Sequence, residues 1–269
     1  MRNFVNYNGK IFPGGESVIN TNDHSYRYGD GLFETMKTRK GNILFEEYHF
    51  DRLFTGLKVL KFQHSSLFTR EKLAIEIKSL CDKNNCTGLA RVRLSVSRGG
   101  GGLYDCDDHL SYLVECWPLE EKGFNENGLL VDIFPGAKKS MDTFSNLKSA
   151  NYLVYVMAAI WARENKLHDA LILNSNEKIC DATIANIFWV KNGKLFTPPL
   201  DEGCVAGVMR RKLMESALPV SESILTEDNL LDADEAFLTN VITGVRWISQ
   251  FRNKKYDNTI SRKVFAGIE

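Results

Sequence analysis

Lys148 is the first of several side chains in this 269-residue chain whose type and surroundings could carry chemistry. It lies among small and polar residues in "NLKSANY", directly before an apolar run. We expect residues 149–166 to form a helix, so that Lys148 stands at the positive end of a helix dipole, which disfavours the charged ammonium. A lysine that attacks a carbonyl carbon needs such an environment. The alternative, a solvated lysine at a helix start, is the interpretation that this stretch alone favours.

A second stretch, "GCVAGVMRR", could bind a phosphate group. Gly207 begins a helix there, so its first free backbone N–H groups come from Val208 and Met209, and such a helix start binds anions. No Gly-Lys-Ser/Thr follows, and the dinucleotide fingerprint is absent, so this is neither type of nucleotide loop. The alternative is a helix that begins at a glycine and binds nothing.

Arg52, in "YHFDRLF", could bind the same kind of group. Its guanidinium presents a planar fork of donors that suits a phosphate, and we expect it early in a helix over residues 49–62. An ordinary ion pair with Asp51 or Glu47 is the alternative.

Asp181, in "ICDATIANIFWV", precedes small residues and a strongly apolar strand. A carboxylate that enters a buried strand must be paired or must have a function. The alternative is an aspartate that caps the turn after "NSNEK".

The elements that must position these residues alternate between strands and helices. An Asn8-Gly9 turn predicts a first hairpin, and Gly41-Asn42 is expected to form a second turn. Helical periodicity predicts helices over 49–62, 69–85, 149–166 and 207–218. Further strands are expected within 88–102, which ends in four glycines, at 129–134, as a series over 169–199, and within 233–248.

This pattern predicts an α+β protein of two lobes, with mostly antiparallel sheets and flanking helices. The polar, glycine-containing segment 119–128 is the expected linker. It separates a smaller N-terminal lobe, 1–118, from a larger C-terminal lobe, 129–269, which carries Lys148.

Composition limits the partners. Lys plus Arg and Asp plus Glu both number 34, which argues against nucleic acid or an anionic membrane as a partner. The chain has no 18-residue apolar run and no secretory signal. Its six scattered cysteines suggest a reducing compartment and offer no zinc-ligand spacing. We expect a cytoplasmic protein without a metal site.

An amine, a phosphate cradle, an arginine fork and a buried carboxylate together meet the needs of pyridoxal 5'-phosphate. In this order the chain resembles the class IV (fold-type IV) aminotransferases, a group that includes branched-chain and D-amino acid aminotransferases and aminodeoxychorismate lyases. The stretches that carry the resemblance are "YGDGLFET", "HFDRL", "SRGGGG", "NLKSANY", "ATIANIFWVKNGKLFTP", "GVMR" and "LTNVITGV".

The resemblance implies roles for individual residues. Lys148 would form the Schiff base with the cofactor and move the proton at the substrate's Cα. Arg52 and the N–H groups of Val208 and Met209 would bind the cofactor's phosphate. The remaining cofactor contacts that it implies are the Asn240, Val241 and Ile242 turn, the Tyr152 hydroxyl near the phenolic oxygen, and Asp181 at the pyridine nitrogen.

Asp181 departs from the family, which usually has glutamate at this position. The shorter side chain keeps the charge, so it could still favour a protonated pyridine. Either the ring or the backbone shifts to meet it, or a water bridges the gap.

The resemblance leaves the reaction open. "LKSAN", "TNVITGV" and the short chain favour an aminodeoxychorismate lyase, which forms 4-aminobenzoate and pyruvate for folate synthesis. The alternative is an aminotransferase of branched-chain or D-amino acids. A catalytically impaired ligand-binding homologue is a third possibility, which Asp181 alone favours.

The substrate side and the assembly also follow from the resemblance. Tyr28, Phe33, Lys37 and Arg98 are expected to face the amino-bearing substrate, although Leu103 lies where the lyases often have arginine. A homodimer is expected because relatives build part of each site from the partner's first lobe, and Tyr28 would then serve the partner's site.

Overall fold

The computed structural model describes residues 3–106 and 109–267 and divides into two compact units. Unit 1 comprises Met1–Glu121 and Leu147–Asn151, and unit 2 comprises Lys122–Asn146 and Tyr152–Glu269. The first boundary falls within the expected linker. The segment around Lys148, however, groups with unit 1 rather than with the C-terminal lobe.

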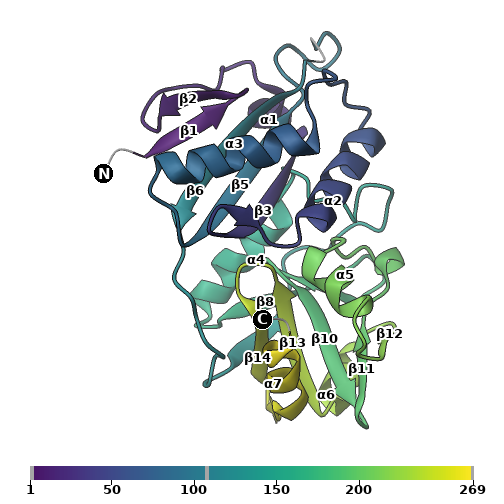
Figure 1. The fold of residues 1–269 in the computed structure, drawn as a ribbon. Helices are drawn as coiled ribbons and strands as arrows, with labels where there is room; N and C mark the ends of the chain where they lie inside the picture. Colours follow the sequence, from purple (N-terminus) through teal and green to yellow (C-terminus); the bar gives the residue numbers. More distant parts are fainter. Residues whose placement is uncertain (1–2, 107–108, 268–269) are drawn as a thin grey trace. The chain divides into compact units, whose positions relative to one another are not determined.

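Unit 1 is built on an antiparallel sheet with the strand order β2-β1-β6-β5-β3-β4 (Figure 1). Its longest pairing joins β3 to β5, from Gly31 opposite Ser97 to Arg39 opposite Leu89. The strands are β1 (Phe4–Tyr7), β2 (Lys10–Pro13), β3 (Gly31–Arg39), β4 (Asn42–Ile43), β5 (Leu89–Ser97) and β6 (Ser111–Pro118).

Two tight turns connect strands of this sheet. Asn8 and Gly9 join β1 to β2 with φ angles of 51° and 83°, as expected for an Asn-Gly hairpin. The second turn lies at Lys40 and Gly41, with φ of 53° and 76°, one residue before the predicted Gly41-Asn42. Asn42 is already in β4, so the glycine takes the second central position, where positive φ is required.

The helices of unit 1 are α1 (His24–Tyr28), α2 (Glu46–Val59) and α3 (Arg70–Lys83). Thr69 caps α3 by accepting the Lys72 N–H at 3.2 Å, and the helix ends before Asn84 as predicted. α2 begins earlier than the predicted residue 49, so Arg52 lies in the middle of the helix rather than near its start.

α2 and α3 pack on one face of the sheet (Figure 1). Val92, Leu94 and Val96 of β5 are buried in the core that these helices complete. Because side chains alternate along a strand, Arg91, Arg93 and Ser95 point to the opposite face.

Unit 2 is built on a mixed sheet with the order β12-β11-β10-β13-β14-β7-β8-β9, with β15 paired to β14. The β7–β8, β7–β14 and β11–β12 pairs are parallel and the others antiparallel. The strands are β7 (Leu129–Ile133), β8 (Asp169–Leu173), β9 (Ile179–Ala182), β10 (Asn186–Lys191), β11 (Lys194–Thr197), β12 (Val220–Glu222), β13 (Glu235–Asn240), β14 (Gly244–Phe251) and β15 (Lys254–Lys255).

Both faces of this sheet are apolar. Ile187 and Trp189 of β10 belong to one core cluster, whereas Phe188 and Val190 belong to another. The flanking helices are α4 (Leu153–Glu164), the 3-10 turn η1 (Leu200–Glu202), α5 (Val208–Met214), α6 (Glu227–Asp232) and α7 (Thr259–Ala266). No helix in the described part of the chain is long and apolar enough to cross a membrane.

Candidate active site

Lys148 lies in a segment that pairs with the start of β3. Its carbonyl accepts the Phe33 N–H at 2.9 Å, and the Ala150 N–H donates to the Gly31 carbonyl at 2.8 Å. α4 begins only at Leu153, so the prediction that Lys148 opens a helix is wrong, and a helix dipole weakens beyond the first turn. The sheet of unit 1 holds the backbone of Lys148 instead.

The aromatic ring of Phe33 lies beside two cationic groups. The Lys148 Nζ is 4.5 Å from the ring centroid, and the Arg93 guanidinium carbon is 4.0 Å from it. Arg93 also donates from Nε to the Ser95 hydroxyl at 3.0 Å. The Phe33 ring therefore lies close to both Lys148, the lysine predicted to form the Schiff base, and Arg93, which the sequence did not single out.

The same sheet face carries further cations. Thr35 of β3 stands opposite Arg93, and Lys37 stands opposite Arg91. Phe33 and Lys37 share this face because they are an even number of residues apart. The alternation in "RVRLSVS" predicts that Arg91 and Arg93 point away from the core. This alternation is the sequence signal that could have identified them.

Arg52 forms a paired hydrogen bond with Glu34, 18 residues away. Its Nε donates to Oε1 at 2.8 Å and its Nη2 donates to Oε2 at 2.6 Å. The neighbouring Asp51 pairs instead with Arg70, at 2.8 Å. Arg52 therefore forms a longer-range ion pair with Glu34, which fixes the plane of the guanidinium.

Glu34 also contacts His49, whose Nδ1 lies 2.7 Å from Oε2. Both side chains are buried. Burial opposes ionisation of Glu34, but the charge and hydrogen bonds of Arg52, with the contact to His49, lower the pKa of the carboxyl to about 2. Glu34 is therefore an ionised, buried anchor for Arg52.

Two residues expected on the substrate side have other described contacts. Arg98 donates to both oxygens of Asp30, at 2.6 and 3.2 Å, and to the Leu60 carbonyl at 2.8 Å. Burial works against it, but Arg98 and His24 hold the pKa of Asp30 below its ordinary value. Tyr28 ends α1, is exposed, and packs edge to face on His24.

Asp181 lies at the end of β9 in unit 2 and is buried. Its Oδ2 accepts from the Tyr155 hydroxyl and the Val205 N–H, both at 2.9 Å, and from Lys139 Nζ at 3.1 Å. Its Oδ1 accepts from the Asn186 amide at 3.0 Å. These contacts make Asp181 a paired, buried carboxylate rather than the cap of a surface turn.

Tyr152 precedes α4 and lies near this carboxylate's partners. Its hydroxyl donates to the Thr183 carbonyl at 3.1 Å, and its ring stacks on Tyr155 with centroids 4.3 Å apart. Tyr155 in turn donates to Asp181. The structure thus connects Tyr152 to Asp181 through one intervening aromatic residue within unit 2.

The start of α5 is formed by glycine, as predicted. The N-cap residue, Gly207, makes no side-chain cap hydrogen bond to the first turn, which contains Val208 and Met209. A Cβ atom on Gly207 would lie 1.8 Å from the Asn186 Oδ1, and Asn186 is the residue that also donates to Asp181. Glycine is therefore required at this position because the buried Asn186 amide occupies the space.

The turn between β13 and β14 is organised by Asn240. Its Oδ1 accepts from the N–H groups of Ile242 at 3.0 Å and Thr243 at 2.8 Å, and from the Thr243 hydroxyl at 3.0 Å. Such an Asx turn fixes the backbone of Val241 at its centre. Like the start of α5, this turn belongs to unit 2.

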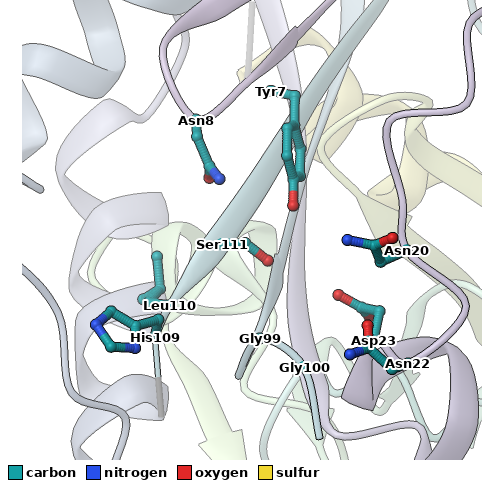
Figure 2. Close-up of a pocket in the computed structure, with 10 residues that line it drawn as sticks. All are labelled: Tyr7, Asn8, Asn20, Asn22, Asp23, Gly99, Gly100, His109, Leu110 and Ser111. Carbon is teal, nitrogen blue, oxygen red and sulfur yellow. The ribbon is translucent and has the colours of Figure 1, made fainter. Parts of the chain in front are cut away.

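A separate polar pocket lies within unit 1 (Figure 2). None of the predicted site residues is among those that line it. Figure 2 shows Asn20, Asn22 and Asp23 on the opposite side of the pocket from His109 and Leu110. The remaining lining residues are Tyr7, Asn8, Gly99, Gly100 and Ser111.

The predicted cofactor residues offer the kinds of hydrogen-bonding and reactive groups that a phosphorylated pyridine aldehyde needs. Lys148 supplies an amine and Arg52 an oriented guanidinium, and the start of α5 supplies N–H groups. Oδ1 of Asp181 has one donor, compared with three on Oδ2, so acceptor capacity remains there. Groups of these types are what a pyridoxal phosphate-dependent enzyme needs.

Comparison with known proteins agrees with this class. The model of the family "Amino-transferase class IV" matches residues 31–251. An aminodeoxychorismate lyase of Vibrio harveyi is 30% identical over 236 residues, covering 84% of this chain and 85% of the relative. A putative branched-chain-amino-acid aminotransferase of Methanocaldococcus jannaschii is 30% identical over 247 residues, covering 88% and 84%.

Among solved structures, a branched-chain aminotransferase of Thermoproteus uzoniensis superposes with a TM-score of 0.88. It covers 99% of this chain and 93% of its own, at 21% identity. The chain belongs to the class IV aminotransferase family. The predicted fold class, enzyme class and pyridoxal phosphate cofactor are thereby confirmed.

Proposed function

We propose that this chain is an aminodeoxychorismate lyase, which splits its substrate into 4-aminobenzoate and pyruvate. The two products together contain all the atoms of the substrate, so the reaction needs no second substrate. The lyase of Vibrio harveyi supports this proposal through its similarity over most of both chains.

The observation that carries the proposal is the cationic sheet face beside Lys148. Each product contains one carboxylate, so the substrate has two, joined to a ring. Phe33 offers an apolar surface for a ring, and Arg93, Arg91 and Lys37 offer positive charge on the same face. A substrate with a small aliphatic side chain and one carboxylate would use fewer of these charges.

Pyridoxal phosphate supplies an aldehyde that bonds an amine and a ring that withdraws electron density from the carbon beside that amine. In our proposal Arg52, Val208, Met209 and the turn of Asn240, Val241 and Ile242 hold its phosphate. Asp181 accepts from its ring nitrogen, and Tyr152 lies near its phenolic oxygen.

Lys148 would bond covalently to the cofactor at rest and act as the base once the substrate has replaced it. Its Nζ would take up the proton from the carbon that bears the substrate's nitrogen. The backbone hydrogen bonds to β3 hold this lysine in place, and the buried Phe33 ring lies 4.5 Å from its Nζ.

A second function, amino transfer from a branched-chain or D-amino acid, is favoured by the similarity to the putative aminotransferase of Methanocaldococcus jannaschii. That reaction leaves the amino group on the enzyme and needs a keto acid to remove it. The dependence on a keto acid is therefore what distinguishes the two functions.

The test is a product assay on the purified enzyme loaded with pyridoxal phosphate. Formation of 4-aminobenzoate and pyruvate from aminodeoxychorismate, without an added keto acid, is the expected result. Turnover of branched-chain or D-amino acids only when 2-oxoglutarate or pyruvate is present, with no 4-aminobenzoate, would overturn the lyase proposal in favour of the aminotransferase.

We also propose a homodimer in the cytoplasm, in which Tyr28 and Arg98 reach the substrate of one of the two sites. The exposure of Tyr28 supports the dimer, and the buried thiols of Cys81, Cys86, Cys116, Cys180 and Cys204 support a reducing compartment. A stable monomer with full activity in light scattering and assay would contradict the dimer.

A further inference from the structure

Lys139 forms a buried ion pair with Asp181, 42 residues further along the chain. The Nζ lies 3.1 Å from Oδ2, and the side chains are only 10% and 3% exposed. Such a pair is costly to bury, so its presence at a predicted cofactor residue requires an explanation.

The backbone of Lys139 is fixed in a way that keeps the pair together. Its N–H donates to the Leu173 carbonyl at 2.9 Å, and its carbonyl accepts from the Ser175 N–H at 3.1 Å. Its ammonium also lies 5.3 Å from the centroid of the Tyr155 ring. The preceding lysine, Lys138, is 48% exposed and forms its ion pair at the surface, with Glu177.

The pair changes what Asp181 can offer to a ligand. A lone carboxylate beside a pyridine nitrogen strongly favours the protonated ring. Here the Lys139 Nζ lies 3.1 Å from the carboxylate, so the charges of the ion pair largely cancel at longer range. Oδ2 is also filled by three donors, which leaves Oδ1 as the oxygen with acceptor capacity.

We propose that Lys139 is a positioning residue that neutralises Asp181 and turns Oδ1 toward the cofactor, so that the ring nitrogen binds its proton less tightly than a lone carboxylate would cause. This inference rests on the proposed role of Asp181 at the ring nitrogen. It explains how a shortened acidic side chain is held in a fixed orientation in this chain.

Other titratable groups near Asp181 remain neutral. Burial raises the pKa of Tyr155 and Cys180 well above their ordinary values, and that of Cys204 to about 12, with the charge of Asp181 adding to each shift. The charged groups beyond these are Glu202, which acts on Cys180, and Arg210, which acts on Cys204. Lys139 and Asp181 are therefore the charged pair in direct contact here.

The test uses holoenzyme loaded with pyridoxal phosphate labelled with ¹⁵N in the ring, whose NMR shift reports the protonation of that nitrogen. Variants form a charge series at the pair. Lys139→Met leaves a net negative charge, the wild type and the Lys139→Met/Asp181→Asn double variant are neutral, and Asp181→Asn leaves a net positive charge. Lys138→Met is the matched surface control, and Lys139→Arg keeps the charge.

We expect the proton affinity of the ring nitrogen to rise at least tenfold, about one pH unit, in Lys139→Met and to fall by a similar factor in Asp181→Asn. The double variant, Lys139→Arg and Lys138→Met should stay near the wild type. If Lys139→Met does not fold, the proton affinity of the ring nitrogen in the double variant must still be about tenfold higher than in Asp181→Asn.

Two results would overturn the inference and are distinguishable. In the first, Asp181→Asn changes the proton affinity of the ring nitrogen and the double variant has the same affinity as Asp181→Asn. Asp181 then acts on the ring and Lys139 does not. If none of the variants changes the nitrogen, Asp181 is not its partner, and the proposed role of Asp181 fails together with the inference.

Discussion

Replacing Glu34 with glutamine tests the anchor that orients Arg52. The wild-type carboxyl is buried and ionised between Arg52 and His49. Glutamine keeps the shape but removes the negative charge, so it leaves the guanidinium without its ionic partner. Breaking a buried pair from one side costs about 3–5 kcal/mol.

The magnitude follows from the pKa. The pKa of Glu34 falls from 4.5 to about 2 on folding. At about 1.36 kcal/mol per unit, this shift contributes roughly 3 kcal/mol of stability. Because the pKa is lowered, the contribution is complete above the unfolded pKa and is lost as the pH falls from 4.5 through about 2.

Glu34→Gln should therefore destabilise unit 1 by about 3 kcal/mol near neutral pH, and this difference from the wild type should shrink as the pH falls toward 2. Hydrogen exchange of amides in α2 and β3 under increasing urea measures it, since a chain of two units need not unfold in one step.

Glu47→Gln is the matched control on the same helix, because Glu47 is exposed, and should remain within about 0.5 kcal/mol of the wild type. A Glu34→Gln difference that is the same at every pH, or no larger than that of Glu47→Gln, would refute the ionised anchor.

The other predictions concern the substrate face and the start of α5. Arg93→Met should raise KM for aminodeoxychorismate at least about tenfold, because a charged hydrogen bond contributes about 1.5–3 kcal/mol. Arg262→Met, which removes an exposed ion pair in unit 2, should leave KM unchanged, and equal effects of the two variants would contradict a substrate role for Arg93. Gly207→Ala should cost about 1–3 kcal/mol, measured by urea unfolding, because the added Cβ displaces Asn186. Gly123→Ala, which meets nothing within 4 Å, is the control, and a Gly207→Ala protein of unchanged stability would show that Asn186 moves freely.

Local signals allowed much of the fold to be predicted. The Asn8-Gly9 hairpin, the Thr69-capped helix α3 and the glycine at the start of α5 each depend on residues close in sequence. The position of Lys148 does not. Its segment pairs with β3, more than a hundred residues earlier, and that pairing delays the helix that the apolar pattern placed at residue 149.

The partners of the site residues show the same limit. The sequence singled out Arg52 and Asp181 but could not supply Glu34 or Lys139, since pairing across 18 and 42 residues depends on how strands and helices pack. Arg93 was within reach, because the alternation of β5 places it away from the core. The sequence therefore did not predict which charged side chains form ion pairs with each other.

The central claim, that Lys148 bonds the cofactor, is tested most directly by borohydride reduction of the holoenzyme followed by peptide mapping. Reduction makes the bond between a lysine Nζ and the aldehyde carbon permanent, so the peptide that carries the pyridoxyl group identifies the lysine. We predict the label on Lys148, and none on Lys139 or in a Lys148→Ala protein. A label on Lys139, or undiminished labelling of Lys148→Ala, would contradict the account.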